Sequence, residues 1–230
     1  MASGSGGVSA FGAAGNYGSM AGQPLNAPII SMAPTADGRG YWLLGADGGI
    51  FTFGDAVFHG STGAMHLNAS IVAMAATPSG GGYWLVAADG GIFTFGDAAF
   101  YGSTGAMHLN APVVGISPSA TGRGYRLVAA DGGIFAFGDA AYNGSMGAVR
   151  LNRPVIGMST DPTTGGYRLV ASDGGVFTFN AGFYGSLGAT ALPAPISTMA
   201  ATVSGNGYYL LGSSGTVYAY GDATWLGNVG

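Results

Sequence analysis

The sequence predicts an all-β protein made of repeated four-stranded sheets, and three observations lead to this prediction. First, the phrase GYWLVAADGGIFTFGDAAFYGS begins at Gly82, and close variants begin at Gly40, Gly124, Gly166 and Gly207, at intervals of 42, 42, 42 and 41 residues. A fixed period of this length is typical of repeat architectures. Second, each unit holds short runs rich in Val, Ile, Phe and Tyr, bounded by Gly, Asp and Pro, which is the pattern of strands. Third, no segment keeps a helical period over three turns.

Each unit contains four such runs, which we label A to D in chain order. In the best-formed unit they are run A at Ile71–Ala75, run B at Tyr83–Ala87, run C at Ile92–Phe95 and run D at Ala99–Gly102. The dipeptide Asp89-Gly90 separates runs B and C, and Asp-Gly between two strands favours a tight type I′ hairpin turn. A connector over residues 103–112 then leads to run A of the next unit.

The arrangement of these strands is predicted from their composition. Run C is apolar on nearly every residue, which indicates a strand covered on both faces. Run A is built from small residues, which suit a crowded inner position. We therefore expect a β-propeller with five four-stranded blades of about 42 residues, at about 29–60, 71–102, 113–144, 155–185 and 196–227, within a single repeat domain over residues 7–230. Six blades with one incomplete, and a solenoid of stacked β-hairpins, are the alternative architectures.

The N-terminal residues do not fit a count of five. Residues 1–6 are expected to be a flexible leader, whereas residues 7–19 repeat runs C and D without a preceding run A or B. This extra half-blade begins an incomplete sixth blade, covers an open edge, or belongs to a longer array. It keeps fewer aromatic residues than the C-terminal copy at residues 215–227, so we expect it to lose the competition for the fifth blade. An unpaired strand edge pairs readily with other chains, so self-association through residues 7–19 is also expected.

The wording GYWLVAADGGIFTFGDAAFYGSTGAMHLNAPVVG resembles a tandem repeat of actinobacterial surface and secreted proteins, and the resemblance covers residues 7–227. It implies an extracellular or cell-wall-associated protein whose signal peptide lies outside this chain. The rhythm of strand, Asp-Gly turn and aromatic strand is similar to five-bladed lectin propellers of the tachylectin type. That second likeness implies carbohydrate binding, although it carries over no individual sugar-binding residue.

Composition excludes several classes of function. Of the 230 residues, 48% are hydrophobic and only 7% are charged, with a net charge of −4 and no basic cluster. Such a surface offers no electrostatic footprint for nucleic acid or for an anionic membrane. No apolar run reaches the roughly 18 residues of a spanning helix, so membrane insertion is not expected. The absence of Cys excludes disulfides and thiolate metal sites.

One position in run B changes while its neighbours stay nearly constant. It is occupied by Trp42, Trp84, Arg126, Arg168 and Tyr209. Trp, Arg and Tyr are the residue types enriched at binding hot spots, and aromatic faces with Arg suit sugar rings or a protein surface. These five residues are therefore the candidate ligand-binding set. The alternative is packing between blades, with the Arg stems lying along apolar surface.

The acidic residues lie at turns, at the B–C position in Asp47, Asp89, Asp131 and Asp173 and at the C–D position in Asp55, Asp97, Asp139 and Asp222. Asp at a turn commonly accepts a hydrogen bond from its own backbone, and equivalent residues one unit apart are too far from each other to share an ion. We therefore expect no metal and no cofactor. No acid or base stands beside a nucleophile, so we do not expect an enzyme. The sequence instead favours a non-catalytic extracellular module that binds a glycan or a protein, with a structural or self-associating surface repeat as the alternative.

Overall fold

The computed structural model describes residues 1–229, and these residues form strands and no helix. The strands make five separate antiparallel sheets of three strands each, in chain order, so the all-β prediction is confirmed. The first strands of the sheets are β1 (Ile29–Pro34), β4 (Ile71–Ala76), β7 (Val113–Pro118), β10 (Val155–Thr160) and β13 (Ile196–Ala201). The second strands are β2 (Gly40–Gly45), β5 (Gly82–Ala87), β8 (Gly124–Ala129), β11 (Tyr167–Ala171) and β14 (Gly207–Gly212). The third strands are β3 (Ile50–Gly54), β6 (Ile92–Gly96), β9 (Ile134–Gly138), β12 (Val176–Phe179) and β15 (Val217–Gly221).

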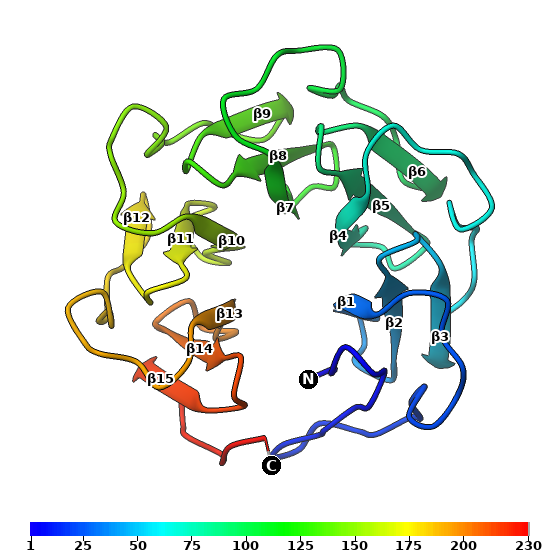
Figure 1. Ribbon diagram of the computed structural model, residues 1–230, viewed down its shortest axis with the longest axis horizontal. Coiled ribbons are helices and arrows are strands. Elements are labelled where there is room, and N and C mark those ends of the chain that lie inside the picture. Colours follow the sequence, from blue (N-terminus) through cyan, green and yellow to red (C-terminus); the bar gives the residue numbers. More distant parts are fainter. Residues whose placement is uncertain (230) are drawn as a thin grey trace.

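The five sheets stand in a ring around a central space, with the first strand of each sheet innermost and the third outermost (Figure 1). The inner strands contact one another in succession from β1 through β4, β7 and β10 to β13. No contact of comparable extent joins β13 back to β1. The strand made of small residues thus takes the crowded central place, and the ring has one position without an inner strand.

The tight connection between second and third strands is a hairpin of a different turn type from the one expected. In the second unit Gly90 donates to the carbonyl of Ala87 over 2.8 Å, and Ala87 donates to Gly91 over 2.9 Å. Gly90 has a φ of 79°, whereas Asp89 is not among the residues with positive φ. This is the pattern of a type I turn followed by a glycine bulge, and not of a type I′ turn, which needs positive φ at both central residues.

The structure differs from the expected four-stranded sheet at run D. Residues 98–103 continue beyond β6 and reach Tyr125 of the next sheet, yet they join no ladder. The main-chain groups of this run are met by side chains of two neighbouring units, as described below. The sheet therefore ends at its third strand.

The hydrophobic core lies between adjacent sheets. In one such interface Trp84 and Val86 of β5 pack against Tyr125 and Leu127 of β8, and all four side chains have no solvent exposure. Every residue of β5 is buried, whereas β6 is only half-buried. The second strand, and not run C, is the one covered on both faces.

Residues 1–19 occupy a sixth place in the ring, between the last sheet and the first. Ala2 bridges to Val8, and the N-terminal amine of Met1 donates to the carbonyl of Ser9 over 2.8 Å. Residues 1–6, expected to be a flexible leader, thus form one side of a turn whose other side is the expected half-blade. Ala2, Val8 and neighbouring apolar residues cover Tyr41 and Leu43 of the first sheet. Residues 7–19 and residues 215–227 therefore do not compete for one place. Residues 215–227 include β15 of the fifth sheet, and residues 7–19 lie in the sixth place.

Residues 1–229 contain no helix that is long and apolar enough to cross a membrane.

Candidate functional site

The predicted ligand-binding residues lie in the interior, between adjacent sheets. Trp42, Trp84 and Arg168 have 0% exposure and Arg126 has 3%, while Tyr209 is half-buried. A side chain without exposure cannot touch a ligand in this conformation. Of the five residues predicted to bind a ligand, only Tyr209 therefore exposes an appreciable part of its side chain.

All five side chains do the same thing despite their different chemistry. Each donates a hydrogen bond to the main-chain carbonyl at one equivalent position in run D of its own unit. The pairs are Trp42 Nε1 to Val57 (2.8 Å), Trp84 Nε1 to Ala99 (2.8 Å), Arg126 Nε to Ala141 (2.6 Å), Arg168 Nε to Gly182 (2.7 Å) and Tyr209 OH to Thr224 (3.0 Å). Trp, Arg and Tyr interchange because each carries an N–H or O–H donor at the end of a long, largely apolar side chain.

The tyrosine that precedes this position holds run D of the previous unit. The Tyr83 hydroxyl accepts from the amide of His59 over 3.1 Å and donates to the carbonyl of Gly60 over 2.6 Å. The same pair of bonds is made by Tyr41, Tyr125, Tyr167 and Tyr208. Burial raises the pKa of Tyr83 above its ordinary value. These hydroxyls link each sheet to the one before it.

Arg168 sits in the most polar part of this interior. It forms an ion pair of 2.7 Å with Asp161, and both side chains are buried. Burial alone would raise the pKa of Asp161, but hydrogen bonds from Thr163 and Thr164 and the charge of Arg168 outweigh it and hold the pKa below its usual value. The guanidinium also lies 5.4 Å from the ring centre of Tyr208. Arg168 therefore packs sheet against sheet through Nε and one terminal nitrogen, while its other terminal nitrogen is buried without a hydrogen-bond partner among the described residues.

The exposed counterpart of this interior is a set of five aromatic residues, one from each unit, which we call the rim aromatics. They share one position in run D, two residues before the glycine that ends the run in every unit. Each follows directly after the residue whose carbonyl accepts the hydrogen bond from run B. They are Phe58, Phe100, Tyr142, Phe183 and Trp225, with exposures of 56%, 60%, 59%, 58% and 58%. The sequence held the signal for this set, namely an aromatic residue at one place in every complete unit, but all run D residues were assigned to a strand.

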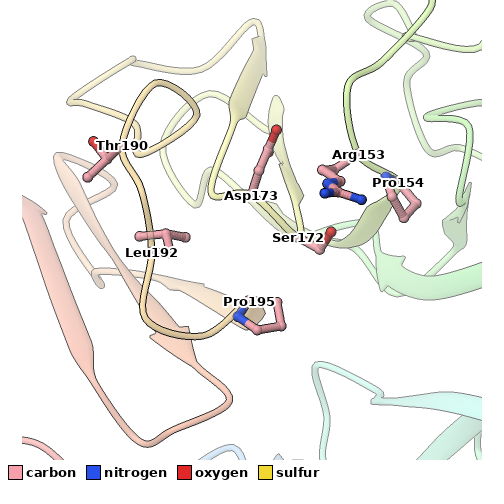
Figure 2. Close-up of a pocket in the computed structure, with 7 residues that line it drawn as sticks. All are labelled: Arg153, Pro154, Ser172, Asp173, Thr190, Leu192 and Pro195. Carbon is pink, nitrogen blue, oxygen red and sulfur yellow. The ribbon is translucent and has the colours of Figure 1, made fainter.

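A shallow pocket lies beside the turn between β11 and β12 and has a volume of about 490 Å³. Figure 2 shows Ser172 and Asp173 at that turn, between Leu192 and Pro195 of the following connector and Arg153 of the preceding one. Arg153 forms no ion pair with any residue from 1 to 229. The pocket thus offers a cation, a carboxylate, hydroxyls and small apolar surfaces, a combination that suits a polar ligand without large net charge.

A second pocket, with a volume of about 250 Å³, lies beside the corresponding turn of the preceding unit. It is lined by Asp131 at the corresponding turn and by Met107, His108 and Asn110 of the connector. Only two lining positions correspond between the pockets, Asp131 to Asp173 and Ala111 to Arg153, so the two pockets lie on different sides of the turn.

The acidic residues of the B–C turns act within their own turns, whereas those of the C–D turns bind the loop between the first and second strands. Asp89 accepts from the amide of Gly91 over 2.9 Å, and Asp47, Asp131 and Asp173 make the same bond. At the C–D turn Asp139 accepts from the hydroxyls of Ser119 and Thr121, and these bonds lower its pKa. Turn capping is therefore confirmed for the B–C set. Within the described part of the chain, no cluster of three or more acidic or histidine side chains suits a metal ion.

Neither a protein-family model nor a curated protein sequence matches this chain.

Proposed function

We propose that this chain is a non-catalytic binding module that works outside the cell, at the cell surface or the cell wall, and takes a glycan at its rim aromatics. The scaffold in this proposal is a β-propeller in which run D replaces the fourth strand of each blade. The observation that carries the proposal is that five equivalent aromatic side chains are each more than half exposed. An aromatic side chain that stays exposed contributes little to the stability of the fold, because most of its apolar surface remains hydrated.

Aromatic rings suit sugars because the C–H face of a pyranose packs on a flat apolar surface, while its hydroxyls stay in water. The rim aromatics meet that need, and aromatic side chains are enriched where proteins bind ligands. The only charged residues in the C–D turns that lead to the rim aromatics are acidic, namely Asp55, Asp97, Asp139 and Asp222. A neutral ligand is therefore favoured over an anionic one.

Repetition gives the proposal its mechanism. One exposed ring binds a sugar weakly, but five copies on one rigid ring can engage a polymer together. Linked binding sites can raise the apparent affinity by about a hundredfold or more without any new kind of contact. The shallow pockets beside Asp131 and Asp173 lie in successive units and offer polar groups to sugar hydroxyls.

The test compares the parent protein with two variants on an array of neutral polysaccharides and cell-wall glycans. The rim variant replaces Phe58, Phe100, Tyr142, Phe183 and Trp225 by Ala. The matched control replaces Met65 and Val149 by Ala, which are exposed to 55% and 53% at another repeated position and line neither pocket. We expect the parent and the control to bind and the rim variant to lose at least about tenfold in apparent affinity, or about 1.4 kcal/mol. A rim variant that binds like the parent contradicts the proposal.

A second function is favoured by a separate observation. The ring has a sixth place that only residues 1–19 begin to fill, and unpaired strand edges promote association between chains. A structural or self-associating surface repeat is therefore the alternative. If the parent binds no glycan and its mass in light scattering rises with concentration, this alternative replaces the first.

A further inference from the structure

The two arginines of run B occupy equivalent places between neighbouring sheets. Arg126 lies on β8 and is 3% exposed, and Arg168 lies on β11 of the next sheet and has no exposure (Figure 1). Each donates through Nε to run D of its own unit. Each also donates through one terminal nitrogen to a loop carbonyl of the following unit, from Arg126 to Gly165 over 3.0 Å and from Arg168 to Gly205 over 2.9 Å. The surroundings of the two guanidinium groups can therefore be compared directly.

Only Arg168 has a carboxylate beside it. The Oδ2 atom of Asp161, seven residues earlier in the chain, lies 2.7 Å from the terminal nitrogen that also binds the loop carbonyl. The same position before Arg126 holds Ser119, which carries no charge. The remaining units have Trp or Tyr in place of the arginine and need no counterion. Among residues 1–229, Arg126 is therefore the one cation of run B without an ion pair.

The charge of Asp139 acts on Arg126, but this carboxylate does not pair with it. Asp139 is exposed and accepts hydrogen bonds from the hydroxyls of Ser119, over 2.6 Å, and Thr121. Burial lowers the pKa of Arg126 below its ordinary value, and the electrostatic effects of Tyr167 and Asp139 oppose this shift without cancelling it. The cationic form of Arg126 is thus less favourable here than in water, and a closer negative charge would stabilise it.

The side of the loop that Asp161 fills in one interface is open in the other. A Cβ on Gly205 would lie 2.8 Å from Oδ1 of Asp161, whereas a Cβ on Gly165 would meet no other atom within 4 Å. The terminal nitrogen of Arg126 beside Gly165 has two N–H groups and makes one hydrogen bond among residues 1–229. The equivalent nitrogen of Arg168 makes two, because it also binds Asp161. A donor of Arg126 therefore remains next to open space.

We propose that a small monovalent anion, of the size of chloride or formate, binds beside Arg126 and takes the part that the Asp161 carboxylate plays beside Arg168. An enclosed charge is costly unless it is paired, and the anion supplies the missing partner. It enters past Gly165, which is half-buried. A bulky anion is excluded because so little of Arg126 is exposed. The bound anion would join the third sheet to the loop of the fourth, since the guanidinium spans both.

The first arm of the test measures the melting temperature of the parent protein at constant ionic strength. Sodium gluconate, whose anion is too bulky for the site, is replaced stepwise by sodium chloride or by sodium formate. The melting temperature should rise and then saturate, by about 3 °C or more at about ten times the dissociation constant. Direct binding is measured by the broadening of the chloride-35 magnetic resonance line. Equal melting temperatures in gluconate, chloride and formate overturn the proposal, because a site that holds only water gives that result.

The second arm removes the cation with Arg126→Trp. Trp42 and Trp84 occupy this position in other units and donate to the same carbonyl of run D, so the variant keeps a donor for Ala141. Its melting temperature should no longer depend on chloride or formate, and it should broaden the chloride line less than the parent does. The comparison uses the change with anion concentration, so a lower starting stability does not affect it. An unchanged response to chloride in this variant overturns the proposal.

The third arm supplies the carboxylate from the chain with the double variant Ser119→Asp, Asp139→Asn. The second change is needed because the side chains of Ser119 and Asp139 are in contact, and two carboxylates there would repel each other. The matched control, Asp139→Asn alone, should keep the response to chloride. The double variant should melt at a higher temperature than this control in gluconate and should show no response. A double variant that responds to chloride as the control does overturns the proposal.

Discussion

At the scale of single residues, two adjacent side chains of the second strand hold run D from both sides. Successive side chains of a strand point to opposite faces. Tyr83 therefore reaches back to His59 and Gly60 of the previous unit, while Trp84 reaches Ala99 of its own. Run D needs no ladder because these donors and acceptors take its place.

Replacing Trp84 by Phe tests the donor role at this position. The carbonyl of Ala99 would lose its donor in a partly buried bond, which costs about 1 kcal/mol or more, and unfolding in urea measures the loss. Tyr209→Phe is the matched control, because its hydroxyl bond to Thr224 is exposed and water can replace it, so the cost should stay below about 0.5 kcal/mol. Equal losses in the two variants would contradict the donor role.

At the scale of elements, the sequence located the units but not the end of each sheet. The strands begin at Ile29, Ile71, Val113, Val155 and Ile196, where the period of the repeat put them, and the Asp-Gly hairpins are present. Run D failed as a strand for a physical reason. Its composition is that of a strand, but its carbonyls are taken by side chains, and such bonds leave no trace in local composition.

The candidate site was misplaced for a related reason. Variation among Trp84, Arg126 and Tyr209 fits a side chain that faces solvent, and it fits equally a side chain that is needed only for its hydrogen-bond donor. The repeats of a single sequence do not distinguish these two cases. The exposed position lay one residue beyond the accepting carbonyl of run D, at Phe100 and its equivalents. Packing between sheets decides which residues of run D face water. The composition of run D alone, which is that of a strand, does not show this.

The tyrosines that join neighbouring sheets predict a loss of stability at alkaline pH. Burial raises the pKa of Tyr83, Tyr125, Tyr167 and Tyr208 above 10.0. The folded state therefore binds these protons more tightly than the unfolded state. The stability they contribute is complete below the ordinary pKa and is lost as the pH rises through the folded values.

Unfolding in urea from about pH 8 to about pH 11 measures this loss, since free tyrosine titrates near 10. Tyr83→Phe should be less stable at neutral pH, because the Gly60 carbonyl loses its donor, and should show a shallower alkaline decline. A variant with the parent's alkaline slope would show that these hydroxyls do not cause it.

At the scale of the whole molecule, the two ends of the chain close the outer side of the ring together. Residues 1–19 cover Ile29, Tyr41 and Leu43 of the first sheet, and the C-terminal segment rests on Phe11 and Gly12. The first and last sheets are thus joined through these segments, and the joint is weaker than the interfaces between complete sheets.

Deleting residues 1–19 should therefore destabilise the ring without abolishing it. Uncovering a large apolar side chain costs about 1.5–3 kcal/mol, so the loss over three such residues should reach at least about 3 kcal/mol in urea unfolding. Light scattering on the same samples measures whether the uncovered face recruits a second chain. Unchanged stability and unchanged mass would show that the segment is only an appendage.

The tyrosine bonds also bear on how many units such a chain can hold. Each hydroxyl binds main-chain groups of the preceding unit, and a main chain is the same in every copy. Inserting or removing a unit would leave every one of these bonds with a partner. The bonds between neighbouring units therefore do not determine the number of units. The number of units must instead be set by the angle between neighbouring sheets and by the contact between residues 1–19 and the C-terminal segment. That contact is the part of the molecule that distinguishes a ring of five units from a ring of six.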